Sequence, residues 1–337
     1  CGCLMVEMQK ENKLCFPQLL NSSCRKPTLH WSKDVLLNTV LSCISLLTAA
    51  LNILVIISVS YFRKLHTPSN ILLLSLAVSD FLVGLLLMPL GILRNTGCWV
   101  LGDIICSLYW YLTSNIVCAS IGNIVLISVD RYVAICDPLH YPSRITLAKV
   151  KLSVCLCWFY AFFYVSLYTK DILLEPGRDN SCYGECVFVI NDIAVVVDLV
   201  FSFIVPVSVI VVLYIRVFVA AVSQARAMRS HVTSVTLQRS LNQTNKSELK
   251  AARTLGILVV VFLACFCPLY YFSLVDENAI NDPAASFVVI IFYFNSCLNP
   301  LIYALFYPWF RNAVKNAVKL IVTLQVFKHN SCEANIL

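Results

Sequence analysis

Two carboxylates stand inside long apolar runs of this sequence, where an unpaired charge is costly. Asp80 ends the run LSLAVSD, and Asp198 interrupts IAVVVDLVFSFIVPVSVIVVLY, eight residues before Pro206. Ionisable residues at membrane depth commonly mark functional sites, because desolvation strengthens their attraction for an opposite charge. No Lys or Arg in the outer halves of the apolar runs is an obvious partner for Asp198. We therefore predict a cationic ligand as its partner; protonation, or a hydrogen bond from a neighbouring hydroxyl, is the alternative.

Around Asp80 the sequence offers polar side chains from other apolar runs. Asn52, Ser120, Asn295 and Asn299 carry the kind of oxygen atoms that small hard cations prefer. We expect these residues to converge on Asp80 and to form a cation site. A buried aspartate that is only hydrogen-bonded within a bundle is the alternative.

A third group of charges lies where an apolar run ends. Asp130 and Arg131 close the stretch that begins at Cys106, and Glu248 precedes a later apolar run on the same side. A buried ion pair between two helices that can break is a suitable element for a two-state switch. We predict an Arg131–Glu248 pair of this kind, with a permanent structural pair as the alternative.

Long apolar spans must position all of these residues. Of the 337 residues, 59% are apolar and 13% are charged, whereas roughly 25% are charged in soluble domains. Uncharged runs of this length indicate transmembrane helices. The predicted spans are 35–61, 70–93, 104–136, 150–169, 190–218, 252–275 and 285–307. We therefore predict an all-α membrane protein, a seven-transmembrane helix bundle.

The segment after the last span has a different pattern. Residues 308–323 place Trp309, Phe310, Val314 and further apolar residues on one stripe, with basic residues elsewhere. This pattern predicts a short amphipathic eighth helix on the inner membrane surface. The predicted organisation is an extracellular amino terminus (1–34), a transmembrane domain (35–307), and an amphipathic helix with a cytoplasmic tail (308–337).

The distribution of charge predicts the orientation. Of the 25 Lys and Arg residues, 17 fall on the side that holds Arg131. An excess of basic residues marks the cytoplasmic side of a membrane protein, so the amino terminus is predicted to be extracellular. The net charge of +7 is therefore attributed to contact with membrane lipid, and we expect no nucleic-acid partner.

The predicted outer side carries features of an oxidising compartment. Asn21 opens the tripeptide Asn-Ser-Ser, an acceptor for N-glycosylation. Disulfides persist on that side of the membrane, although sequence alone leaves their connectivity open. The outer cysteines that we consider are Cys1, Cys3, Cys15, Cys24, Cys106, Cys182 and Cys186.

These residues closely resemble the rhodopsin-like (class A) G-protein-coupled receptors. The matching features are Asn52, LAVSD ending at Asp80, Trp99, Cys106, DRYVAIC (130–136), Pro206 with Tyr214, CFCP (265–268) and NPLIY (299–303). Within that group the chain is similar to the trace amine-associated receptors. That similarity rests on CDPLHYPSRIT (136–146), CYGEC (182–186), KSELKAARTLG (246–256) and NSCLNPLIYALFYPWFRNAVK (295–315).

The resemblance implies roles for particular residues. It implies disulfides Cys106–Cys186 and Cys24–Cys182, with Cys15 as the alternative to Cys24. It implies a sodium site at Asp80, Ser120, Asn295 and Asn299, and no other cofactor. The expected G-protein switch residues are Asp130, Arg131, Tyr132, Tyr214, Glu248 and Tyr303.

Two positions depart from the amine receptors. The aspartate that anchors the ligand ammonium normally lies 18 residues before the DRY arginine, where this chain has Thr113. Asp198 instead resembles the transposed aspartate of a mainly fish-type subset of the family. Phe266 stands where a Trp is usual, which keeps the aromatic bulk but loses the indole N–H.

We therefore predict a plasma-membrane receptor for trace or biogenic amines, of an olfactory type, that activates a cyclase-stimulating heterotrimeric G protein. Its ligand site is expected to contain Asp198, Thr113, Phe266, Tyr270 and Tyr293. A class A receptor for a neutral or peptide ligand is the alternative. An enzyme is not expected: an intramembrane hydrolase would need His and carboxylate ligands for a metal, and all five His residues lie outside the spans. A retinal photoreceptor is excluded because the last span has no Lys.

Overall fold

The computed structural model describes residues 14–19, 22–25, 31–189, 191–230, 256–271, 283–306, 310–312 and 314–315. In this part of the chain the regular elements are helices, and two isolated β-bridges join Leu14 to Arg25 and Ser23 to Tyr183. The elements in order are α2 (Trp31–Tyr61), η1 (Arg63–Leu65), α3 (Pro68–Leu82), η2 (Val83–Leu87), α4 (Met88–Thr96), α5 (Asp103–Cys136), α6 (Tyr141–Arg144), α7 (Leu147–Tyr168), α8 (Lys170–Leu174), α9 (Asp192–Asp198), η3 (Leu199–Ile204), α10 (Val205–Ser230) and α12 (Pro283–Phe306).

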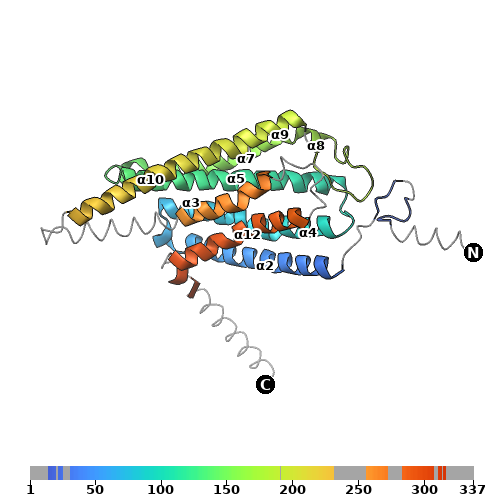
Figure 1. Cartoon of the computed structure of the whole chain (residues 1–337), viewed down its shortest axis with the longest axis horizontal. Coiled ribbons are helices and arrows are strands. Elements are labelled where there is room, and N and C mark those ends of the chain that lie inside the picture. Colours follow the sequence, from blue (N-terminus) through green and yellow to red (C-terminus); the bar gives the residue numbers. More distant parts are fainter. Residues whose placement is uncertain are drawn as a thin grey trace, which may run out of the picture.

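The long helices run side by side as a bundle (Figure 1). Among the described residues, six are long and apolar enough to cross a membrane, and the shorter apolar helix Gly256–Tyr271 lies between the fifth and the sixth of these in chain order. α5 occupies the middle, where it packs against α3, α7 and α10. The prediction of an all-α seven-helix membrane bundle is confirmed.

Helix starts follow local sequence rules. Thr67 accepts a hydrogen bond from the backbone N–H of Asn70 and precedes Pro68 at the first turn of α3. Thr146 caps α7 in the same way, and Asn191 caps α9 by accepting from the N–H of Ala194 at 2.7 Å. Such caps satisfy the backbone donors that a helix start leaves without partners.

Two π-helical segments interrupt the spans, and each follows one of the two membrane aspartates. η2 begins three residues after Asp80 and ends two residues before Pro89; η3 begins directly after Asp198 and also ends two residues before a proline, Pro206. A proline cannot donate the usual backbone bond to the preceding turn. A local π-helical turn absorbs that defect, and such turns are frequent at functional sites.

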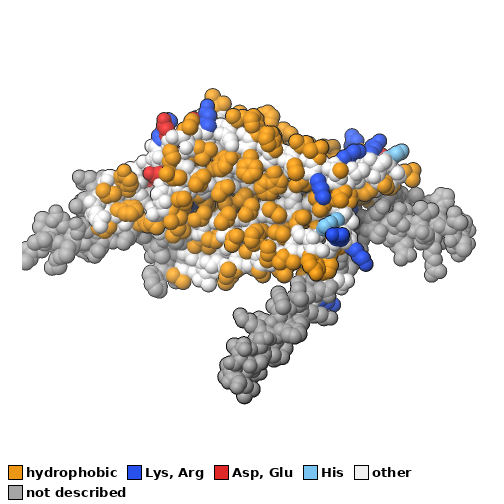
Figure 2. All heavy atoms as spheres, turned by 180° about the vertical axis from the view of Figure 1, so that it is seen from behind, with side chains coloured by type: hydrophobic (Ala, Val, Ile, Leu, Met, Phe, Trp, Pro, Cys, Tyr) orange, Lys and Arg blue, Asp and Glu red, His pale blue; other side chains and the backbone are white. Residues whose placement is uncertain are grey.

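The surface of the bundle suits a membrane. Figure 2 shows a broad band of apolar side chains around the middle of the molecule, with the charged side chains gathered toward its ends. Polar residues such as Asn52, Asp80 and Asn123 are instead buried in the interior. Polar groups at this depth avoid lipid, which cannot hydrogen-bond with them.

The described part of the predicted eighth helix packs on the end of the bundle. Phe310 is 2% exposed and joins the main apolar core, with Val314 packed against that core. Arg311 donates to the backbone carbonyls of Ala304 and Leu305 at 3.1 and 2.9 Å, near the end of α12. The remainder of the predicted segment 308–323 lies outside the described residues.

Candidate functional site

Asp198 is the last residue of α9 and is partly buried, with Tyr164 of α7 beside it. Its Oδ1 accepts a hydrogen bond from the Tyr164 hydroxyl at 3.2 Å and another from the Ser202 hydroxyl at 2.6 Å. No Lys or Arg pairs with it within the described part of the chain. The carboxylate is thus oriented by two neutral donors, and its charge has no opposite charge beside it.

Two groups of stacked aromatic rings come from the elements next to this carboxylate. On α7, Tyr164 is stacked between Tyr160 and Tyr168, with ring centroids 5.7 and 6.2 Å apart and nearly parallel planes. Phe203 of η3 stacks on Tyr270 with centroids 4.1 Å apart. An aromatic environment with a carboxylate suits an organic cation, because ring faces attract positive charge.

Above this region, further aromatic contacts lead toward the outer loops. The Tyr168 ring lies 6.2 Å from Phe188, which stacks on Trp110 at 4.9 Å. The guanidinium of Arg94 lies over Trp110, 4.8 Å from the ring centre. These contacts connect the outer loop that contains Phe188 with the neighbourhood of Asp198.

The other predicted ligand residues have partners of their own. The Thr113 hydroxyl donates to the carbonyl of Tyr109 in the same helix, at 2.7 Å. Tyr293 is buried, and its hydroxyl is hydrogen-bonded to that of Tyr109. Both hydroxyls lie beside Gly91, where an added Cβ would come within 2.8 Å of Tyr293 and 3.3 Å of Tyr109. Phe266 is 3% exposed and packs in the main core.

Asp80 is enclosed in the bundle and is 1% exposed. Asn299 donates to its Oδ2 at 2.7 Å, and Ser296 of the same helix, α12, also hydrogen-bonds to it. Asn52 lies nearby but donates to the backbone carbonyls of Thr48 and Ser296, each at 3.0 Å. The predicted cluster therefore joins α2, α3 and α12, and Ser296 is a member that the sequence analysis did not name.

Several buried oxygen atoms in this interior accept no hydrogen bond from the described residues. They are Oδ1 of Asn52, Asp80, Asn295 and Asn299. Ser120 is buried as well. Carboxylate and amide oxygens are the types of ligand that a small hard cation such as sodium prefers.

At the other end of α5, Asp130 is the centre of a polar network. It forms an ion pair with Arg131, and it accepts hydrogen bonds from the Ser69 hydroxyl at 2.9 Å and the Tyr141 hydroxyl at 2.8 Å. Arg131 also donates to Ser69. Burial raises the pKa of the Tyr141 phenol above its ordinary value, so the phenol keeps its proton and remains a donor.

The predicted partner of Arg131, Glu248, lies outside the described residues, so the Arg131–Glu248 pair stays a prediction. Tyr303 is fully buried in the core, and Tyr132 is partly buried beside Ile135 and Val217. An added Cβ at Gly256 would lie 3.7 Å from the Tyr214 ring, so Tyr214 of α10 contacts the start of the helix Gly256–Tyr271.

Three disulfides link the outer segments among the described residues. Cys106 pairs with Cys186, Cys24 with Cys182, and Cys15 with Cys98. The question of Cys15 against Cys24 is thus answered in favour of Cys24, and the set of outer cysteines considered from sequence was incomplete, because it omitted Cys98. Asn21, the predicted glycosylation site, lies outside the described residues.

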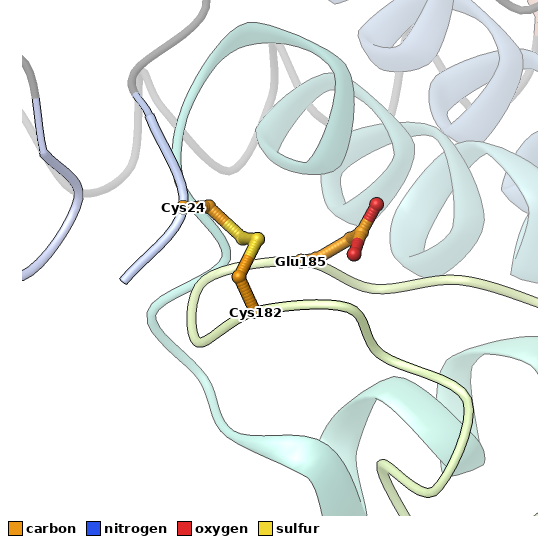
Figure 3. Close-up of side chains that lie close together, drawn as sticks. All are labelled: Cys24, Cys182 and Glu185. Atoms are coloured by element: carbon orange, nitrogen blue, oxygen red, sulfur yellow. A yellow bond between two sulfur atoms is a disulfide. The ribbon is translucent and has the colours of Figure 1, made fainter. Parts of the chain in front are cut away.

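These disulfides hold the segment Leu14–Arg25 against two outer loops. Tyr183 exchanges backbone hydrogen bonds with Ser22 and Cys24, at 2.7 and 2.9 Å. Gly184 has a φ of +103°, and a Cβ at this position would lie 2.9 Å from that of Cys15, so the contact requires glycine. Figure 3 shows Glu185 beside the Cys24–Cys182 disulfide. The two sulfur atoms are bonded to each other, so they do not serve as metal ligands.

Comparisons with known proteins agree with this architecture. Residues 51–303 match the model of the 7 transmembrane receptor (rhodopsin family). The chain belongs to this family. It is 38% identical over 340 residues to trace amine-associated receptor 13c of Danio rerio, with 96% of each chain covered. It is 36% identical over 326 residues to trace amine-associated receptor 5 of Mus musculus, with 94% of each chain covered.

Within the rhodopsin family, the chain is therefore a class A G-protein-coupled receptor of the trace amine-associated receptor family. Members of this family are receptors rather than enzymes, and they are multi-pass proteins of the plasma membrane.

The receptor site includes residues that sequence reasoning missed. Ser202 was available as a signal, because it lies four residues after Asp198 on one helical face. Tyr164, Ser69 and Tyr141 come from other elements, and only their packing brings them to Asp198 or Asp130. Cys98 lies in a loop, and its distance along the sequence from the other cysteines does not predict which of them it pairs with.

Proposed function

We propose that this receptor binds an amine whose ammonium group pairs with Asp198, and that binding activates a heterotrimeric G protein. The observation that carries the proposal is the environment of Asp198: a partly buried carboxylate in the membrane span, oriented by two hydroxyls and without a cationic partner among the described residues. The related receptors are named for trace amines. Asp198 then replaces the anchor that Thr113 cannot provide.

The apolar part of the ligand would lie against the nearby aromatic residues. Tyr270 is stacked on Phe203 and lies four residues after Phe266, whose ring is buried in the core. Tyr293 and Thr113 both hydrogen-bond to Tyr109 of α5, and we propose that they form the side of the ligand site toward that helix. We infer that this transposed anchor places the receptor with the fish-type subset of the family and that its role is olfactory.

Signalling would use the network at the other end of α5. In the resting state we expect Arg131 to be held by Asp130, Ser69 and Glu248, with Tyr132, Tyr214 and Tyr303 completing the switch. Ligand binding must favour the open state, because a ligand with equal affinity for both states shifts nothing. The released Arg131 would then allow a cyclase-stimulating G protein to bind on the cytoplasmic side.

A sodium ion is proposed for the resting state. Asp80, Asn295 and Asn299 supply buried oxygens without donors, and Ser120 supplies a hydroxyl. The ion would favour the resting packing around Asp80. We further propose that residues 1–34 are extracellular and glycosylated at Asn21, that 35–307 bind ligand and lipid, and that 308–337 lie at the inner surface.

The test is cyclic-AMP production in cells that express the receptor or its Asp198→Asn variant, each matched for surface expression. Primary, tertiary and di-amines are applied to both. A response that is lost in the variant supports the proposal. A response that survives in the variant places the anchor elsewhere, and an intact receptor that is silent to all amines favours a neutral or peptide ligand.

A further inference from the structure

We propose that Tyr164 and Ser202 are ligand contacts that make the site selective for a primary ammonium ion over its N-methylated forms. This inference rests on the proposed function, because it takes Asp198 as the anchor. It adds to that function a contact from α7 and a definite chemical class of ligand.

The geometry gathers three oxygen-bearing side chains. The hydroxyls of Tyr164 and Ser202 both donate to Oδ1 of Asp198, at 3.2 and 2.6 Å. Oδ2 of Asp198 accepts no hydrogen bond from the described residues. It is not one of the fully buried polar atoms that lack a partner, so a ligand atom can reach it. An incoming donor therefore meets one open carboxylate oxygen with two hydroxyl oxygens beside it.

The number of acceptors matches a primary ammonium. A hydroxyl that donates one hydrogen bond still carries lone pairs that accept. The three N–H groups of R–NH₃⁺ then have three partners: Oδ2 of Asp198, Oη of Tyr164 and Oγ of Ser202. Each N-methyl group removes one N–H and turns a methyl toward an oxygen, which leaves a desolvated polar group without a partner.

The local structure holds both hydroxyls in place. Ser202 lies within the π-helical segment η3, four residues after Asp198, and it is buried. The Tyr164 ring is stacked between the rings of Tyr160 and Tyr168. Tyr164 contacts Asp198 through its hydroxyl, at 3.2 Å. A hydroxyl beside the anchor is a hydrogen-bond partner for an N–H group, whereas a cage for a methylated cation is built from ring faces.

The experiment uses three amines that share one carbon skeleton: pentylamine, N-methylpentylamine and N,N-dimethylpentylamine. On the unmodified receptor, we expect the half-maximal concentration for cyclic AMP to rise by about tenfold with each methyl group, as for loss of a charge-assisted hydrogen bond. Equal potency of the three amines, or greater potency of the dimethylated one, would overturn the inference without any mutation.

Two variants test the contacts themselves. Tyr164→Phe and Ser202→Ala should each weaken the response to pentylamine by about tenfold and the response to the dimethylated amine by less than about threefold. Matched controls are Tyr111→Phe, which removes a hydroxyl bonded to Ser166 at 2.9 Å, and Ser208→Ala on the exposed side of α10. Neither control should change the order of the three amines.

The failures are distinguishable. If Tyr164→Phe and Ser202→Ala weaken all three amines equally, the hydroxyls only orient Asp198, and the inference is wrong. If the three amines are equally potent but Asp198→Asn still abolishes every response, Asp198 remains the anchor and the proposed selectivity is wrong. If Asp198→Asn leaves the pentylamine response intact, the proposed function itself is wrong.

Discussion

Asp80 and Asp198 are residues of one type, each within a membrane-spanning helix, yet their surroundings differ. Asp80 is 1% exposed and is bonded by Asn299 and Ser296 of α12, in an interior that contains further amide oxygens without donors. Asp198 is only partly buried, and its neighbours are two hydroxyls and stacked rings. We infer that the neighbours, rather than the carboxylate, decide between the inorganic cation proposed at Asp80 and the organic one proposed at Asp198.

The local backbone does not account for that difference. Both aspartates are followed within three residues by a π-helical segment that ends two residues before a proline. The difference arises from the helices that pack opposite: α12 brings amides and a serine to Asp80, and α7 brings a tyrosine to Asp198. Tertiary packing therefore assigns each site its chemistry.

The largest expected effect is on the half-maximal amine concentration, which should distinguish Asp198 from Asp80. Asp198→Asn should raise the half-maximal amine concentration by more than about 100-fold, because removal of one member of a desolvated charge pair costs several kcal/mol. Asp80→Asn should change it by less than about tenfold. Cyclic-AMP dose–response curves at equal surface expression measure both. Similar losses in the two variants would abolish the distinction.

The second prediction distinguishes Asp80 from Asp198 by the effect of sodium on thermal stability. We expect sodium chloride, compared with choline chloride, to raise the melting temperature of the purified receptor by roughly 2–4 °C, as for about 1 kcal/mol of linked binding. Asp80→Asn should lose this shift and Asp198→Asn should keep it. Thermal unfolding followed by fluorescence measures the shift, and an intact shift in Asp80→Asn would place the ion elsewhere.

A smaller effect concerns Asp130, near the end of α5. Tyr141→Phe removes a hydroxyl that donates to Asp130 at 2.8 Å, and this loss should weaken the network that holds Arg131. We expect ligand-free cyclic AMP to rise by about two- to fivefold, in line with the loss of one hydrogen bond. Tyr61→Phe, an exposed tyrosine at the end of α2, is the control. Unchanged basal signalling would show that Tyr141 does not stabilise the resting state.

The smallest effect concerns the disulfides that hold the amino-terminal segment against the outer loops. The double variant Cys15→Ser with Cys98→Ser leaves the Cys24–Cys182 disulfide to hold the same segment. We expect amine potency to change by less than about threefold, since the remaining link restricts most of the freedom of the chain. The sodium shift should stay the same. Loss of surface receptor in this variant, measured by antibody labelling, would show that the third disulfide is required for folding.

Much of the fold could be predicted from the sequence. The predicted spans 104–136 and 285–307 agree with α5 and α12 to within two residues at each end, because long apolar runs leave a helix few alternatives in lipid. The span at 190–218 was predicted to end earlier than α10, which continues to Ser230. Polar residues can extend a helix beyond the membrane, and hydropathy does not detect them.

The site was predictable only in part. Asp198 and Asp80 are evident as charges in apolar runs, and Ser202 could have been found by its spacing of four residues. Tyr164 and Ser296 could not, because no local pattern shows which face of another helix will pack against an aspartate. The Cys15–Cys98 disulfide was missed for a similar reason: its cysteines lie 83 residues apart, and sequence does not fix connectivity.

The most direct test of the central claim is saturation binding of a labelled primary amine to membranes that contain the receptor, Asp198→Asn or Asp80→Asn. Binding separates ligand recognition from signalling, so a damaged switch cannot imitate a lost anchor. We predict saturable binding in the unmodified receptor and in Asp80→Asn, and none in Asp198→Asn at equal receptor density. Unchanged affinity in Asp198→Asn would contradict the account.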